Sequence, residues 1–218
     1  MSIDGYIDDA RDTRLLLSNA GDFDRVDAVR AGCDAILVGA HTIRRDNPRL
    51  LVRSPGRRDA RIARGLPPSP TKVTLTEHGD LDPTAAFFSA GAIDKIVYCA
   101  SPTAGKVRER LDGVAVVVDA GDPVDLTHVL TDLAGRGIGR LVVEGGGGTH
   151  TRFLTAGLAD EVHLVVAPFF VGDSRAPRFV GDGAFPWNPR HPATLAEVRR
   201  IGDVVLLRYA LSERFGAG

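Results

Sequence analysis

Two widely separated apolar runs that pass through glycine into polar segments constrain this chain most strongly. The first covers residues 35–38 and leads through Gly39 to Thr42. The second covers residues 141–143 and leads into Glu144 and the four glycines 145–148. Both runs are too short and too apolar for surface helices and are predicted to be buried strands. Strands that end in glycine present backbone N–H groups to phosphate-bearing ligands in α/β sheets. The pattern predicts an enzyme that binds a nucleotide cofactor beside a second, charged substrate.

Other apolar runs alternate with helix-like segments, as in an α/β protein. Further strands are predicted at residues 72–76, 95–99, 114–118 and 161–167. Helices are predicted at residues 126–133 and 149–158, from Pro83, and between a cap at Asp22 or Asp24 and an end at Gly32. The β-branched run at residues 114–118 favours a strand that is covered on both faces.

The last part of the chain has a different pattern. Residues 194–201 and 204–211 flank a Gly202-Asp203 turn, which is typical of a β-hairpin. We expect an α/β body closed by this antiparallel hairpin. Since no internal repeat or low-complexity linker interrupts the chain, a single domain over residues 1–218 is the simplest organisation.

Composition excludes several classes of protein. The 27 basic residues nearly balance the 28 acidic ones, which argues against a nucleic-acid partner. The two cysteines fit a reducing compartment, and no apolar run approaches the ~18 residues of a membrane span. The first residues lack the features of a signal peptide, so we predict a cytoplasmic protein. The absence of Cys-x-x-Cys and His-x-Glu pairs excludes a zinc deaminase site, and no metal is expected.

One local group of arginines stands out against this balanced charge. Arg57, Arg58, Arg61 and Arg64 lie in a stretch rich in proline and glycine. We predict a solvated loop there, with a contact surface as the second interpretation.

The four glycines are compatible with a plain flexible turn, because they lack the spacing of the dinucleotide fingerprint and of the P-loop. We favour a phosphate-binding role, since the predicted helix starts at Thr149 directly after them. The bare N–H groups and positive end of that helix would meet a pyrophosphate.

Four charged residues near these loops each have a functional and a structural interpretation. Glu144 follows a strand at the end where α/β sheets bind ligands, but it could be a solvent-facing strand end or a capping acceptor. Asp46 could serve only an Asx turn with Asn47 and Pro48. Arg30 could simply complement a helix C-terminus, and Arg53 could be an ordinary surface charge.

Five motifs in one order add a family resemblance. They are Ser2-Ile3-Asp4-Gly5, Gly39-x-x-Thr42-x-x-x-Asp46-Asn47-Pro48-x-Leu50-x-Val52-Arg53, Glu144-Gly145-Gly146, Gly157-Leu158-x-Asp160-Glu161-Val162 and Ala167-Pro168-x-x-x-Gly172. The series resembles the reductase domain of riboflavin biosynthesis, a relative of dihydrofolate reductase. The match extends from Ser2 to about Leu211.

The resemblance implies a fold, a reaction and partners. It implies a dihydrofolate reductase-like α/β fold with a central mixed, mostly parallel sheet flanked by helices, and a homodimer. NADPH is the implied hydride donor, and the implied substrate is a ribosylamino-pyrimidine 5′-phosphate whose ribosyl group becomes ribityl. The family places an apolar strand before the first motif. We expect the natural start to lie upstream of Met1, and the loss of this central strand is the second interpretation.

The resemblance also assigns positions to the two ligands. Cofactor-binding positions are Leu15, Gly39, Thr42, Asp46, Thr76, Gly145, Gly146, Gly147, Gly148 and Thr149, with the loop and helix start as far as Arg152 on the pyrophosphate. Substrate-binding positions are Asp4, Thr13, Arg30, Leu50, Arg53 and Glu144.

The chemistry of the implied reaction gives these residue types roles. A glycosylamine opens to an imine, which hydride then attacks, so the site must align the reactants and stabilise a cation. Glu144 is the leading catalytic candidate for that electrostatic role, and Asp46 is the second, as an orienting acceptor. Arg30 and Arg53 suit the substrate phosphate, which guanidinium groups bind in a forked geometry.

Two other functions compete with this one. An NADPH-dependent reductase of dihydrofolate, a pterin or a specialised metabolite would not need both Arg30 and Arg53. A nucleotide-binding regulatory module would bind NADPH without oxidising it. The sequence leaves open whether the pyrimidine is aminated or deaminated, and whether Thr76 or the Arg44-Arg45 pair selects NADPH over NADH.

Overall fold

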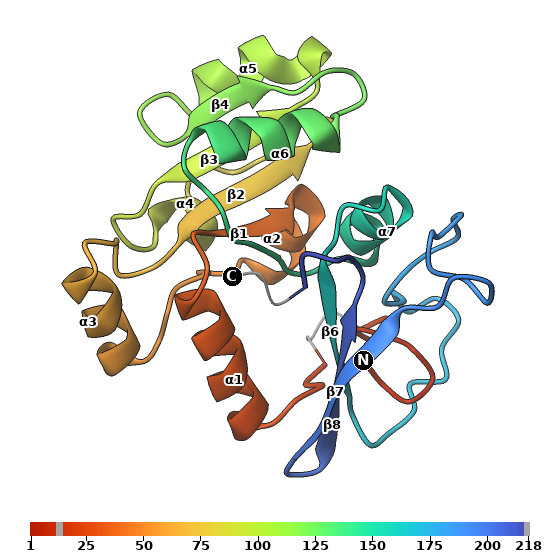
Figure 1. The fold of residues 1–218 in the computed structure, drawn as a ribbon. Coiled ribbons are helices and arrows are strands. Elements are labelled where there is room, and N and C mark those ends of the chain that lie inside the picture. Colours follow the sequence, from red (N-terminus) through yellow and green to blue (C-terminus); the bar gives the residue numbers. More distant parts are fainter. Residues whose placement is uncertain (12–14, 216–218) are drawn as a thin grey trace. The chain divides into compact units, whose positions relative to one another are not determined.

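The computed structural model describes residues 1–11 and 15–215. The chain divides into two compact units (Figure 1). The parallel-sheet unit is Val26–Gly145, and the hairpin unit is Met1–Arg25 together with Gly146–Gly218. Helix α1 (Ala20–Ala31) crosses the division between them.

The sheet of the parallel-sheet unit has the strand order β4-β3-β2-β1-β5, with every neighbouring pair parallel. Its strands are β1 (Ala35–Gly39), β2 (Thr71–Thr76), β3 (Lys95–Cys99), β4 (Val116–Asp119) and β5 (Leu141–Val143). Strand β1 lies between β2 and β5, and its first four side chains are buried, which explains its unbroken apolar run. The predictions of these strands are confirmed.

Short helices connect the strands of this sheet, and some pack against it (Figure 1). They are α2 (Ala40–Asp46), α3 (Pro55–Ala63), α4 (Ala86–Ser89), α5 (Ala104–Arg110) and α6 (Leu126–Gly135), with the 3-10 turn η1 (Ser101–Thr103) before α5. One hydrophobic core joins α2, α4 and α5 to β1 and β3. The helices contribute the side chains of Ile43, Phe87 and Val107, each at most 3% exposed. Burying such a side chain contributes roughly 1.5–3 kcal/mol. No helix in the described residues is both long and apolar enough to cross a membrane.

Three predicted elements differ in detail. The strand predicted at residues 114–118 is β4, an edge strand whose Val116 is half exposed, because β-branched residues suit edge and central strands alike. Helix α4 begins three residues after Pro83, since Asp82 instead accepts a hydrogen bond from the Thr84 N–H in a turn. At α1 the cap is Asn19, whose side chain accepts the Asp22 N–H at 3.1 Å.

The hairpin unit holds a separate antiparallel sheet with the strand order β6-β8-β7. Its strands are β6 (Glu161–Val166), β7 (Thr194–Ile201) and β8 (Val204–Ala210), and α7 (Gly147–Thr155) precedes them. The predicted hairpin is confirmed, with Gly202 in the left-handed region at its turn. Asn19 holds this turn by donating to the Ile201 carbonyl and the Asp203 carboxylate. The predictions did not include the pairing of β6 with β8.

A buried lysine lies in the parallel-sheet unit. Lys72 on β2 is fully buried, and its Nζ donates to the carbonyls of Phe87 and Ala90 at the end of α4. Burial lowers the pKa of Lys72 to about 8, and the positive charge of Lys95 acts in the same direction. The ammonium therefore satisfies two orphan carbonyls of a helix end while its charge is disfavoured.

This lysine makes stability depend on pH in a defined direction. Between pH 8 and the ordinary lysine pKa of about 10.4 the unfolded chain binds the proton more tightly, so stability rises with pH. The test is to measure the free energy of unfolding of the wild type and of Lys72→Met in urea across this range. As pH rises, the wild type should gain about 1–3 kcal/mol in unfolding free energy relative to the variant. A difference that does not change with pH would contradict the assignment.

Candidate active site

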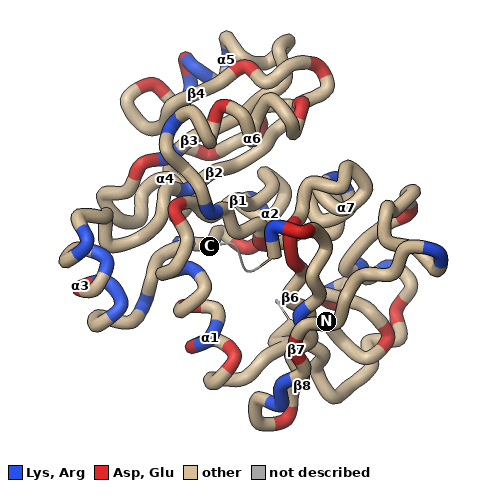
Figure 2. The backbone as a smooth tube through the Cα atoms, viewed as in Figure 1, with Lys and Arg blue, Asp and Glu red and all other residues tan. Residues whose placement is uncertain are grey.

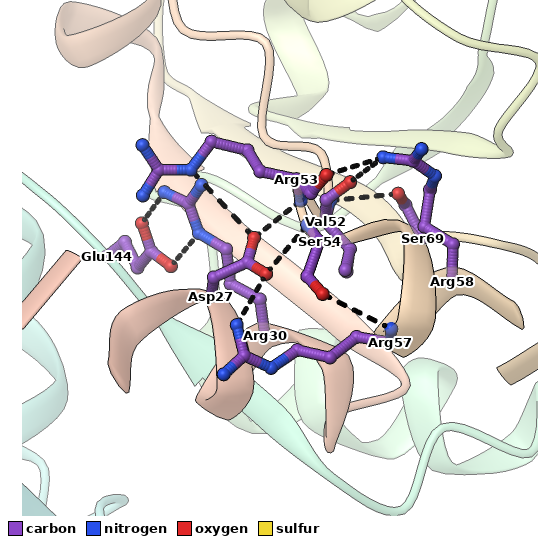
Figure 3. Close-up of polar contacts among 9 residues, drawn as sticks. All are labelled: Asp27, Arg30, Val52, Arg53, Ser54, Arg57, Arg58, Ser69 and Glu144. Atoms are coloured by element: carbon purple, nitrogen blue, oxygen red, sulfur yellow. Dashed lines mark hydrogen bonds and ion pairs between the residues drawn. The ribbon is translucent and has the colours of Figure 1, made fainter. Parts of the chain in front are cut away.

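The candidate site is built on the last two turns of α1, in the parallel-sheet unit. Asp27 and Arg30 are three residues apart, so they lie on the same face of the helix. Each holds a segment that is distant in sequence, as Figure 3 shows.

Arg30 pairs with Glu144, which follows β5 directly. The Arg30 Nε lies 2.7 Å from Glu144 Oε1, and Nη2 donates to Oε2, so the pair is bidentate. The Arg30 side chain is 17% exposed and that of Glu144 is 22% exposed. Burial lowers the pKa of Arg30, but the hydrogen bonds and charge of Glu144, aided by Asp27, outweigh it and raise the pKa overall. The sequence predicted separate roles for Arg30 and Glu144, and the structure brings them together as one charge pair.

Asp27 binds the residues at the start of α3 through hydrogen bonds. Its carboxylate accepts the backbone N–H groups of Arg53 and Ser54, and Arg57 Nη1 donates to it at 3.0 Å. The Nε of Arg53 lies 3.9 Å from the same carboxylate. Asp27 was not among the predicted site residues, although its position one turn before Arg30 on a predicted helix was an available signal.

The arginines of residues 57–64 do not form a solvated loop, so that prediction is wrong. Pro55 at the first turn and the Ser54 side chain, which accepts the Arg57 N–H, begin helix α3. Arg61 is buried and donates to the carbonyls of Ala31 and Cys33. Figure 2 shows the remaining basic positions along α3.

The two glycine-containing loops come from neighbouring strands. Because β1 pairs with β5 in parallel, their carboxyl ends lie at one edge of the sheet. Gly145 lies next to Thr42 of α2: a Cβ on Gly145 would be 3.1 Å from Thr42 Cγ2. The two loops therefore meet at Thr42 and Gly145.

The structure requires glycine at three of the positions 145–148, for different reasons, and not at the fourth. Gly145 and Gly146 have positive φ angles of 76° and 81°, which favour glycine. A Cβ on Gly147 would lie 2.4 Å from the carbonyl oxygen of Arg178. A Cβ on Gly148 would meet nothing within 4 Å. Helix α7 begins at Gly147 rather than at Thr149 as predicted, since the last two glycines adopt helical geometry.

Other predicted positions have structural tasks of their own. Asp46 ends α2, and Asn47 follows in the left-handed region, so the turn interpretation of this segment has support. Leu50 is buried at 3% exposure with a φ of 49°. The Thr76 hydroxyl accepts the Gly79 N–H at 2.9 Å. In the parallel-sheet unit, Gly39 is the residue before α2.

The remaining predicted positions belong to the hairpin unit. Asp4 accepts hydrogen bonds from the Ser2 hydroxyl and from the backbone of Val171 and Gly172, and these lower its pKa to about 2. The Leu15 N–H donates to Asp8. Thr13 lies outside the described residues. No group of three or more His, Cys, Asp or Glu side chains in residues 1–11 and 15–215 could hold a metal ion.

A parallel sheet flanked by helices, with Glu144 and the glycine run following β5 at its carboxyl edge, defines an α/β protein. The family model described as the RibD C-terminal domain matches residues 1–207. The chain belongs to this family, which confirms the resemblance.

Individual relatives agree with the family assignment. The chain is 31% identical over 98% of its length to the 2,5-diamino-6-ribosylamino-4(3H)-pyrimidinone 5′-phosphate reductase of Archaeoglobus fulgidus, covering 94% of that protein. It is 34% identical over 97% of its length to the protein of the same name from Methanothermobacter thermautotrophicus, again covering 94%. A pyrimidine reductase-like protein from Corynebacterium diphtheriae has the same fold, with a TM-score of 0.77 at 22% identity over 96% of this chain and 88% of that one. The predicted fold class is confirmed, with the antiparallel strands in a sheet of their own.

The Arg30–Glu144 pair should act as one unit in stability. We expect Arg30→Gln and Glu144→Gln each to lower the free energy of unfolding. The double variant should lose about 1–3 kcal/mol less than the sum of the two single losses, and this difference is the coupling free energy. Urea unfolding of the four proteins measures this coupling. Additive effects would show that the pair contributes no interaction free energy.

Proposed function

We propose that this chain is an NADPH-dependent reductase of riboflavin biosynthesis that converts the ribosyl group of a ribosylamino-pyrimidine 5′-phosphate to ribityl. The observation that carries the proposal is the bidentate Arg30–Glu144 pair at the carboxyl end of β5, beside the Asp27–Arg53 contact. The cluster in Figure 3 has four guanidinium groups and two carboxylates, so it favours an anionic substrate.

The aminated pyrimidinone is the favoured substrate. Both relatives described above carry that compound in their names and match nearly the whole chain. The deaminated pyrimidine differs at one ring substituent, and it becomes the comparison substrate in the test below.

The cofactor would be held in part by the residues around the start of α7. Gly145 and Gly146 precede a helix of nine residues, α7, whose N-terminal N–H groups favour a pyrophosphate. Gly148 leaves space at this helix start that a side chain would fill. NADPH would supply the hydride. Thr42, Asp46 and Thr76 remain predicted cofactor positions.

Glu144 would stabilise the cationic imine of the opened ribosylamine. Each carboxylate oxygen has two lone-pair positions, and Arg30 uses one on each oxygen in the observed pair. Capacity therefore remains for a cationic or N–H group of the substrate. Arg30 fixes the orientation of the carboxylate, so no reorganisation is needed when charge develops.

A homodimer is part of the proposal, and an apolar sheet face in the hairpin unit supports it. Strand register places Leu195, Val198 and Arg200 of β7 opposite Tyr209, Leu207 and Val205 of β8, and Val162, Leu164 and Val166 of β6 on that same face. Leu195 and Val198 are 50% and 61% exposed. An apolar face of this kind marks an association surface.

The function is tested by incubating the protein with NADPH and the phosphorylated ribosylamino-pyrimidinone while following nicotinamide absorbance. We expect oxidation coupled to a ribityl product, faster with the aminated than with the deaminated compound. Dihydrofolate serves as the negative substrate. NADPH oxidation with dihydrofolate but with neither pyrimidine would overturn the proposal.

The variant Gly148→Ala tests whether this position contacts the cofactor, because the substitution should not weaken the fold. Alanine is favoured over glycine in a helix by about 1 kcal/mol, so the variant should be as stable as the wild type or more stable. If the pyrophosphate approaches this position, the KM for NADPH should rise about tenfold, a loss of roughly 1.4 kcal/mol. Gly105→Ala is the matched control, because Gly105 is likewise the second residue of a helix with nothing within 4 Å. Equal KM values for the two variants would remove Gly148 from the cofactor site.

Val198→Asp tests the dimer. A charge on the apolar face should convert the dimer to monomer, as measured by light scattering after size-exclusion chromatography. Thr194→Asp is the control, since Thr194 is also exposed and pairs with Ala210 on the opposite face of the sheet. A wild-type monomer, or dissociation in both variants, would contradict this interface.

A further inference from the structure

Asp27 is a buried carboxylate whose contacts all converge on one short segment. Its side chain is 3% exposed. It accepts the N–H of Arg53 through Oδ1, and through Oδ2 it accepts the N–H of Ser54 at 3.1 Å and the Arg57 guanidinium at 3.0 Å (Figure 3). Neither the sequence motifs nor the family resemblance assigns this residue a role.

The charge of Asp27 is maintained by these contacts. Burial raises the pKa of a carboxyl group, but the N–H groups of Arg53 and Ser54 and the guanidinium of Arg57 outweigh burial and lower the pKa of Asp27. A buried carboxylate is stable only when it is paired and hydrogen-bonded in this way.

These contacts set the geometry of the arginines. Residues 53 and 57 are four positions apart, yet both are tied to the same carboxylate, one mainly through its backbone and the other through its side chain. The Arg53 side chain is 59% exposed and thus accessible to a ligand. Arg58 donates to the Arg53 carbonyl at 2.7 Å and so also restrains the Arg53 backbone.

We propose that Asp27 is a positioning residue for substrate binding: it fixes residues 53–57 so that the guanidinium groups of Arg53 and Arg57 together receive the 5′-phosphate. The inference deepens the proposed function and rests on it for the identity of the substrate. Asp27 itself does not contact the phosphate, because a buried carboxylate would repel it. The residue acts through the arginines, while Arg30 one turn later orients Glu144.

The test compares Asp27→Asn with Asp34→Asn. Asparagine is nearly isosteric with aspartate, but it removes the charge and places an NH2 donor among N–H donors. Asp34 is a matched control, since it accepts two backbone N–H groups, from Gly139 at 3.0 Å and Arg140 at 2.8 Å. Those contacts lie at the amino ends of β1 and β5, opposite to the edge that holds Glu144.

Two measurements are made on the full chain. Calorimetric titration with ribose 5-phosphate should show about tenfold weaker binding to Asp27→Asn than to the wild type, and about equal binding to Asp34→Asn. In steady-state kinetics, Asp27→Asn should raise the KM of the phosphorylated substrate about tenfold with kcat within about threefold. A general loss of structure would not produce this split between KM and kcat.

The titration keeps this inference separate from the proposed function. Weaker ribose 5-phosphate binding to Asp27→Asn in a protein without reductase activity would uphold the positioning role and overturn the proposed reaction. A folded Asp27→Asn variant with unchanged affinity would overturn the positioning role, as would a wild type that does not bind ribose 5-phosphate. If Asp27→Asn fails to fold, Arg57→Gln replaces it: the inference requires weaker binding there too, and unchanged binding overturns it.

Discussion

Opposite charges one turn apart on α1 connect three segments of the parallel-sheet unit. Arg30 holds Glu144 at the end of β5, and Asp27 holds the residues that begin α3. Each contact satisfies a charge that is mostly removed from water, so loss of one partner would leave the other uncompensated. The candidate site depends on this face of the helix, because it orients both the carboxylate proposed for catalysis and the arginines proposed for the phosphate.

The parallel sheet supplies the second constraint. Since β1 and β5 are neighbours, residues that follow them meet at one edge although they are far apart in sequence. Thr42 and Gly145 meet there, and the glycine run leads from this edge into α7. Three of the four glycines have a steric or backbone reason within the protein itself, whereas Gly148 has none. That difference makes Gly148 the most informative of the four about a cofactor.

Much of the fold could be predicted from the sequence, because short apolar runs report buried parallel strands directly. The helix at residues 55–63 was missed, since Pro55 and Gly56 resemble a loop unless the Ser54 cap is recognised. The full burial of Lys72 could not be predicted, because its partners are carbonyls at the end of a helix elsewhere in the chain. For the site, residue types indicated Arg30, Arg53 and Glu144, but only the structure pairs Arg30 with Glu144 and identifies Asp27 as the residue that gathers residues 53–57.

Glu144, oriented by Arg30, is proposed to act on the reacting substrate rather than on cofactor binding. Glu144→Gln tests it most directly, with kcat from steady-state kinetics and the NADPH Kd from titration. We expect kcat to fall about 100-fold or more while the Kd changes by less than about threefold, because an electrostatic contribution of this kind is specific to the transition state. Equal losses in kcat and in NADPH affinity would contradict it.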